Sequence, residues 1–251
     1  MNQVQVDIQN EKRFLHLAAA SAFATVITTI AIHQISYPAG SFEQSLQLYQ
    51  NKAYLAQNWI ILLHCLLVLV SMLGVALMIR RMSTPLAIFG LLFFALFVFT
   101  EWERTLGNLW HLNGLRKRYI ATTDVEALQF LRYELQYRLS QSNVQFLLFT
   151  LGISLGNASY GMALIGGNKL DRLLGAGLLL WAGCTSIAFV VDFYPAQWMD
   201  KIVQACNKIY QPLIRFAIGY WMLKTIQGEG SGRRRDEKVL YRHPFKRSGG
   251  T

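Results

Sequence analysis

The feature that most constrains the fold is a series of six apolar segments, each about as long as a bilayer is thick. The hydrocarbon core of a bilayer is ~30 Å thick, and about 20 residues of α-helix cross it. Because lipid offers the peptide groups no water, a segment of this length crosses it as a helix. The segments lie near residues 14–35, 59–79, 85–105, 144–166, 173–193 and 202–223. The sequence therefore predicts an all-α, polytopic transmembrane helix bundle with about six spans.

Composition agrees with a membrane domain that covers residues 1–224. Hydrophobic residues make up 53% of the chain and charged residues only 15%, whereas a typical soluble domain carries about 25% charged residues. The mean hydropathy is +0.28. These values exclude an ordinary water-soluble domain.

The connection at residues 107–143 is long enough to hold structure of its own. We expect a turn at Asn113–Gly114, followed by a capping box in which Thr123 is paired with Glu126. Leucines then recur at helical spacing as far as Leu139. The sequence predicts a helix that projects from the membrane and continues into the fourth span.

The sixth segment is the least regular of the series. It can span the bilayer with a polar face toward the bundle interior, or it can lie on the membrane surface as an interfacial helix. We expect it to span. The polar residues that interrupt it are Gln204, Asn207, Lys208, Gln211, Pro212 and Arg215.

Charge asymmetry predicts that both termini are cytoplasmic. Six spans place the termini on one side, and basic residues are more numerous there, mainly because of the C-terminal segment. Residues 225–251 form a basic tail whose Arg233, Arg234 and Arg235 suit anionic lipid or an acidic protein partner. Since these charges directly follow a hydrophobic helix, we expect no nucleic-acid binding despite the net charge of +10.

The cysteines predict no disulfide framework. Cys65, Cys184 and Cys206 are odd in number, lie in apolar stretches and include no CxxC pair. Buried cysteine usually acts as a small apolar side chain.

Threading the six spans brings ionisable residues together at the membrane face opposite the termini. Ionisable residues in spans often mark function, although charges are also tolerated at helix ends because they can reach water. Glu101 and Arg104 stand three residues apart and can simply pair, while Glu103 points to another side of the helix. The candidate cluster is His33, His64, Glu101, Arg104 and Asp192.

Three functional interpretations of this cluster stay open. It can form a polar pocket for an ion, proton or small solute, with Ser154 and Asn157 as deeper partners. His33 and His64 can bind zinc or iron together with Glu101 or Asp192, or they can hold a b-type haem. We expect no cofactor, because no single helix carries a metal-binding motif.

Three strings in the second half of the chain resemble those of a known group of proteins. The strings LGNASYG (155–161), LLGAGLLLWAG (173–183) and QPLIRFAIGYWMLK (211–224) resemble a broad group of uncharacterised small six-helix bacterial membrane proteins. The resemblance implies a six-helix bundle in a bacterial inner membrane. It supplies no catalytic residues.

Function remains open between different classes of protein. The sequence shows no Walker loop, no GxSxG elbow and no dinucleotide fingerprint. This absence favours a non-catalytic accessory, scaffold or partner-binding component, which would contact its partner through the basic tail or the 107–143 connection. The alternatives are a transporter or ion- or proton-pathway protein that uses the polar cluster, and a membrane-embedded metal or haem enzyme.

Overall fold

The computed structural model describes the backbone of residues 3–191, 193–194 and 196–240, and side chains within residues 9–228 of these ranges. This part of the chain consists of helices and connections, without strands. The helices are α1 (Gln3–Gln34), α2 (Phe42–Leu46), η1 (Gln47–Gln50), α3 (Lys52–Ile79), α4 (Thr84–Leu106), η2 (Gly107–Leu112), α5 (Asn113–Ala121), α6 (Val125–Ile165), α7 (Lys169–Val191), α8 (Gln197–Ala205), η3 (Cys206–Tyr210) and α9 (Gln211–Leu240).

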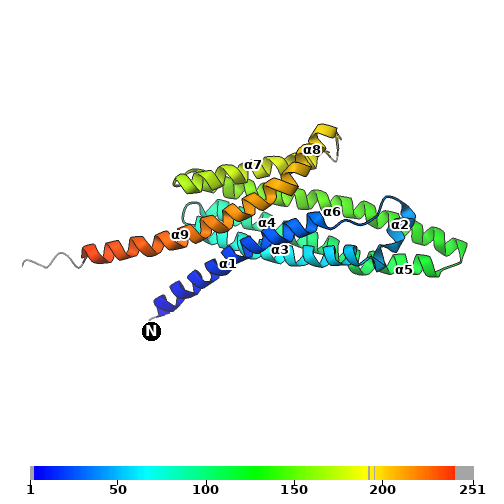
Figure 1. Cartoon of the computed structure of the whole chain (residues 1–251), viewed down its shortest axis with the longest axis horizontal. Helices are drawn as coiled ribbons and strands as arrows, with labels where there is room; N and C mark the ends of the chain where they lie inside the picture. Colours follow the sequence, from blue (N-terminus) through cyan, green and yellow to red (C-terminus); the bar gives the residue numbers. More distant parts are fainter. Residues whose placement is uncertain (1–2, 192, 195, 241–251) are drawn as a thin grey trace, which may run out of the picture.

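The long helices pack as a ring in chain order. α1 packs on α3, α3 on α4, α4 on α6 and α6 on α7. Helix α9 packs on both α7 and α1 and so closes the ring (Figure 1). Since successive helices run antiparallel, α9 ends at the same end of the molecule where α1 begins (Figure 1).

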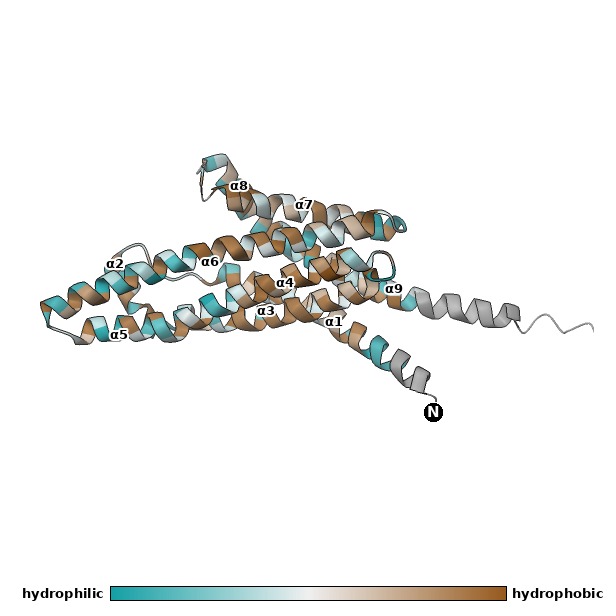
Figure 2. Ribbon diagram, turned by 180° about the vertical axis from the view of Figure 1, so that it is seen from behind, coloured by the Kyte–Doolittle hydropathy of each residue, from teal (hydrophilic) through white to brown (hydrophobic). Residues whose placement is uncertain are grey.

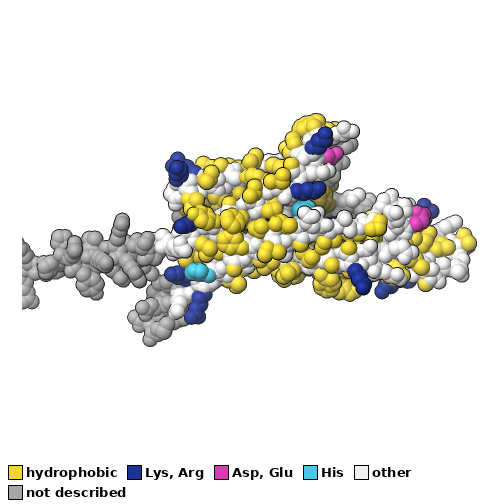
Figure 3. All heavy atoms as spheres, viewed as in Figure 1, with side chains coloured by type: hydrophobic (Ala, Val, Ile, Leu, Met, Phe, Trp, Pro, Cys, Tyr) yellow, Lys and Arg dark blue, Asp and Glu magenta, His cyan; other side chains and the backbone are white. Residues whose placement is uncertain are grey.

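Five helices of the described part are long and apolar enough to cross a membrane. Hydrophilic residues gather toward the ends of the bundle (Figure 2), and apolar side chains cover the flank shown in Figure 3. Outward-facing apolar residues include Ile27, which is 71% exposed, and Phe99, which is 65% exposed. An apolar exterior of this extent suits lipid and not water. The prediction of an all-α membrane helix bundle is confirmed. The five helical stretches are Gln9–Gln34, Lys52–Ile79, Thr84–Ala121, Val125–Ile165 and Lys169–Val191.

The sixth predicted segment is helical but is not among these five. It forms α8, the π-helical turn η3 and the first half of α9. Its polar residues lower its hydropathy, and among them Arg215 is buried within the bundle. The segment belongs to the ring, while its passage through the bilayer stays a prediction.

Two details of the projecting connection differ from prediction. The turn expected at Asn113–Gly114 is absent, because the helix of α4 continues through η2 and α5 as far as Ala121. The N-cap of α6 is Asp124, whose side chain accepts a hydrogen bond from the Glu126 amide, and not Thr123. Beyond this cap α6 runs unbroken for 41 residues, which confirms the prediction that the projecting helix continues into the span.

A small second core holds the projecting end together. Helices α2, α5 and the first turns of α6 lie side by side there (Figure 1). The buried guanidinium of Arg116 donates hydrogen bonds to the Tyr54 hydroxyl at 3.1 Å and to Asn113 Oδ1 at 2.8 Å. These contacts fix α5 onto the start of α3. The apolar residues of this core are Leu46, Leu112, Leu115, Leu131 and Leu135.

Glycines allow α6 to approach both of its neighbours. A Cβ at Gly152 would lie 2.9 Å from the Phe93 carbonyl oxygen of α4, and a Cβ at Gly175 would lie 2.9 Å from the Gly161 carbonyl oxygen. Small residues at such crossings let backbones come close. Gly183, in contrast, has nothing within 4 Å of an added Cβ, so its position requires no glycine.

The close approach of α6 and α7 can be tested with one added methyl group. We expect Gly175→Ala to reduce stability by about 1–3 kcal/mol, because the methyl group meets backbone atoms that cannot move aside. Gly183→Ala, on the same helix, is the matched control, and it should leave stability unchanged or slightly raise it. Thermal unfolding of the purified protein in detergent measures both. Equal effects of the two changes would contradict the packing described here.

Candidate functional site

A cavity of about 250 Å³ lies inside the ring, near the end opposite the chain termini. Every long helical segment of the ring contributes to its wall. The lining residues are Thr29, Ile32 and His33 of α1; Ile61, His64 and Cys65 of α3; Phe97, Glu101 and Arg104 of α4; Phe146, Phe149, Thr150 and Ile153 of α6; Trp181, Thr185 and Ala188 of α7; Asn207 of η3; and Gln211 of α9.

The structure brings four residues of the candidate cluster to this one cavity. His33, His64, Glu101 and Arg104 all line it, although they come from three different helices. The fifth candidate, Asp192, lies outside the described residues. The alternation of helix direction therefore placed the four polar groups at the same depth.

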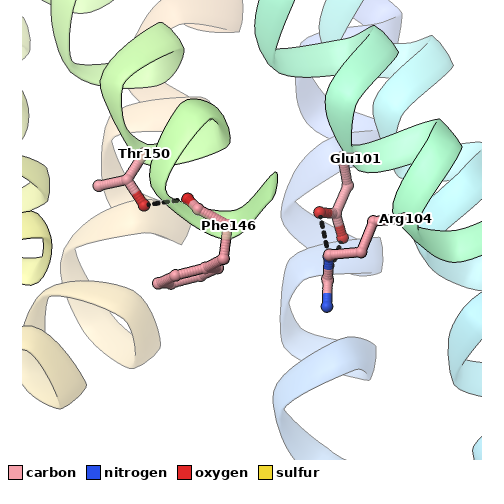
Figure 4. Close-up of polar contacts among 4 residues, drawn as sticks. All are labelled: Glu101, Arg104, Phe146 and Thr150. Carbon is pink, nitrogen blue, oxygen red and sulfur yellow. Dashed lines mark hydrogen bonds and ion pairs between the residues drawn. The ribbon is translucent and has the colours of Figure 1, made fainter. Parts of the chain in front are cut away.

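Glu101 and Arg104 form an ion pair on the cavity wall. Arg104 Nε donates to Glu101 Oε2 at 2.8 Å, and Arg104 Nη2 donates to Oε1, so the contact is bidentate. Figure 4 shows this pair on α4, with Phe146 and Thr150 of α6 across from it. Glu103 is exposed on another side of the helix. The prediction that Glu101 pairs with Arg104, and that Glu103 stands apart, is confirmed.

The two histidines are not arranged as a metal site. His64 Nδ1 lies 2.8 Å from the Thr28 hydroxyl oxygen, so a hydrogen bond between α3 and α1 already uses this nitrogen. Among the described residues, no three His, Cys, Asp or Glu side chains are grouped as ligands for a metal ion. The donor set proposed from His33, His64 and Glu101 is therefore not assembled by this geometry.

Arg215 of α9 is a buried residue beside the site that sequence reasoning did not select. Its side chain is only 2% exposed, and its Nε, Nη1 and Nη2 atoms have no hydrogen-bond partner among the described residues. Arg215 does not itself line the cavity, but Gln211, one turn before it on α9, does. An arginine within a membrane helix often marks a functional position. In the sequence analysis, however, we interpreted Arg215 only as one of the polar residues that interrupt the sixth segment.

Two further polar groups of the cavity wall lack partners within the described part of the chain. They are the Thr29 hydroxyl and the Trp181 indole nitrogen, both buried. The indole N–H can only donate, and so can a guanidinium. Glu101 is already neutralised by Arg104, and the buried Arg215 lies one turn from the cavity residue Gln211 on α9. The cavity is therefore suited to a group that accepts hydrogen bonds and carries negative charge.

The other residues selected from the sequence lie elsewhere. Ser154 bonds to the Ala182 carbonyl oxygen of α7 at 2.9 Å, and Asn157 bonds to the Ile153 carbonyl oxygen of its own helix at 2.7 Å. Both stabilise helices and neither lines the cavity. The side chains of the basic tail, including Arg233, Arg234 and Arg235, lie outside the described residues.

Comparison of the chain with protein-family models, with curated proteins and with solved structures found no match.

The ion pair on α4 provides a test of the cavity wall. We expect Glu101→Gln to lower stability by about 1.5–3 kcal/mol, because Arg104 then loses its counter-charge and one of its two hydrogen-bond acceptors in a largely buried position. Glu103→Gln, which removes the same charge from an exposed position two residues away, should have little effect. Thermal unfolding in detergent at neutral pH compares the two variants. A loss of equal size in both would argue against the buried pair.

Proposed function

We propose that this integral membrane protein binds a small amphiphile with an acidic head group, such as a carboxylate or phosphate, in the cavity of the ring. The observation that carries the proposal is the buried Arg215, whose guanidinium has no hydrogen-bond partner among the described residues. The protein acts as a non-catalytic binding component of the membrane.

An unpaired buried cation is costly, and this cost supports an anionic ligand. Removing an ion from water still costs several kcal/mol after relaxation of the protein, unless a counter-charge and hydrogen bonds compensate it. The guanidinium presents its N–H groups in a planar fork that matches carboxylate and phosphate oxygens. A bound acid would supply both the charge and the hydrogen bonds that Arg215 lacks. Trp181 and Thr29 supply further donors nearby.

The remaining wall of the cavity is suited to an apolar body. Phe97, Phe146, Phe149 and Ile153 line it from α4 and α6. Small-molecule sites combine such apolar surfaces with a few placed polar groups that fix the orientation of the ligand. An acid with a short hydrocarbon chain has both parts.

This proposal narrows the interpretations drawn from the sequence. A binding component agrees with the non-catalytic class that we favoured, and a solute-carrying protein would need the same site. The site supports a metal enzyme less well, because no three His, Cys, Asp or Glu side chains among the described residues are grouped as metal ligands. We further propose a bacterial inner-membrane location with cytoplasmic termini. Protein contacts are proposed through the basic tail or the 107–143 connection.

Ligand charge is the sharpest test of the proposal. We expect octanoate and octyl phosphate to raise the unfolding temperature of the protein in a non-ionic detergent more than octanol or octylamine do. In Arg215→Met the preference for the acids should fall at least about tenfold, which corresponds to about 1.4 kcal/mol of binding free energy. No preference for acids in the unsubstituted protein would refute the proposal.

Arg116 serves as a matched control for Arg215. Both arginines are buried, but Arg116 has partners in Tyr54 and Asn113. We expect Arg116→Met to lower the stability of the ligand-free protein by about 1.5–3 kcal/mol. Arg215→Met should instead leave it unchanged or raise it by about 1–4 kcal/mol, because an uncompensated charge is removed. Similar losses in both variants would mean that Arg215 has only a structural role.

A further inference from the structure

We infer that Cys184 of α7 and Cys206 of η3 form a disulfide bond. The bond joins α7 to the π-helical turn that leads into α9. Their sulfur atoms lie 2.7 Å apart, close to the ~2.05 Å of a disulfide bond. Both side chains are half-buried, whereas the third cysteine, Cys65, is buried on α3. The inference does not depend on the proposed ligand, since the bond can form with the cavity empty or filled.

Independent contacts fix the register that places these two sulfurs together. One turn beyond Cys206, the Tyr210 hydroxyl donates to the Gly177 carbonyl oxygen at 2.8 Å. The Tyr210 ring also stacks on Trp181, with the ring centroids 5.8 Å apart. These contacts hold η3 against the face of α7 that carries Cys184. The approach of the cysteines is therefore part of a defined helix interface.

The local backbone around Cys206 is irregular in a way that suits a functional position. Residues Cys206–Tyr210 form a π-helical turn between α8 and α9. Such turns insert a residue into the helix and often occur at functional sites. Here the turn presents Cys206 to α7, while the next residue, Asn207, lines the cavity.

The bond would form by thiol–disulfide exchange with a disulfide-bearing oxidant, either a protein or a small molecule. The Cys206 thiolate attacks one sulfur of the oxidant and releases the other as a thiol. The Cys184 thiolate then attacks Cys206 in this mixed disulfide and releases the second oxidant sulfur. The protein loses two protons and two electrons, and the oxidant gains them. With cytoplasmic termini, as proposed above, the cysteines lie at the opposite, non-cytoplasmic end, where disulfides persist.

The consequence would be a fixed wall on one side of the cavity. Thr185 and Asn207 directly follow the two cysteines in the chain, and both line the cavity. A covalent link between α7 and η3 therefore limits separation of the helices on which these residues lie. Helix α9, with Arg215, continues directly from η3.

Peptide mapping of the full-length protein tests the bond. The purified protein in detergent is treated with oxidised glutathione, alkylated while denatured, and digested with trypsin without reduction. Cleavage after Arg172, Lys201 and Lys208 separates the cysteines, with Cys184 on peptide 173–201 and Cys206 on peptide 202–208. We expect the two peptides as one linked species, lighter than their sum by two hydrogen atoms, with Cys65 alkylated. Reduction before alkylation should release them as separate alkylated peptides.

Single substitutions supply the controls. Cys184→Ser and Cys206→Ser should each leave the remaining partner fully alkylated, while Cys65→Ser should leave the linked species intact. Oxidation should also raise the unfolding temperature of the unsubstituted protein but not that of the Cys184→Ser variant. Full alkylation of all three cysteines after oxidation, or a link to Cys65, would overturn the inference. If the linked peptides are found but the protein shows no preference for acids, only the proposed function is refuted and the disulfide stands.

Discussion

The structure depends on one constraint, which is that a polar group in the hydrocarbon core of a membrane must find its partner within the protein. Side-chain hydrogen bonds between helices meet this requirement at several levels of the ring. The Tyr160 hydroxyl of α6 donates to the Met72 carbonyl oxygen of α3 at 3.1 Å. The Trp221 indole of α9 donates to Asp171 of α7 at 2.7 Å. The Tyr160 contact crosses the ring between α6 and α3, and the Trp221 contact ties α9 to its neighbour α7.

Against this background the exceptions are informative. Seven residues of the described part have buried polar atoms without a hydrogen-bond partner, and three of them lie at or beside the cavity: Arg215, Thr29 and Trp181. The other four are Ser71, Thr105, His111 and Arg138. Thr29 and Trp181 lie on the wall of the cavity, and Arg215 lies one turn beyond the cavity residue Gln211. Unsatisfied groups scattered through a bundle would only lower its stability. Gathered around a space that can hold a ligand, they describe what that ligand must provide.

Helix length made much of the fold predictable from the sequence. Bilayer-length apolar segments and short connections determine antiparallel neighbours, and antiparallel alternation brings His33, His64 and Glu101 to one depth. Local turn signals were less reliable. Asn113–Gly114 is a typical turn pair, yet the helix from α4 into α5 continues through it, because Leu112 and Leu115 pack into the projecting core. Here tertiary burial outweighs local preference.

Contacts across the ring were beyond the reach of sequence reasoning. Nothing in the spacing of Cys184 and Cys206, 22 residues apart, indicates that η3 would bring them together, because that contact depends on the register of α7 against η3. Small residues illustrate the same limit. Gly152 and Gly156 face α4, whereas Gly161 of the same helix faces α7. The spacing of small residues in the sequence identifies the helix face on which they lie, but it does not identify the helix that packs against this face.

The low hydropathy of the sixth segment is explained by its position in the ring. Asn207 and Gln211 make the segment poorly suited to lipid, but both face the cavity, and Arg215 is covered by protein. A helix of this kind depends on its neighbours, because lipid contact on all sides would leave its polar groups without partners. Its packing on α1 and α7 provides that cover and also completes the cavity. The same polar residues thus keep α9 out of the set of candidate spans and place a buried arginine beside the cavity.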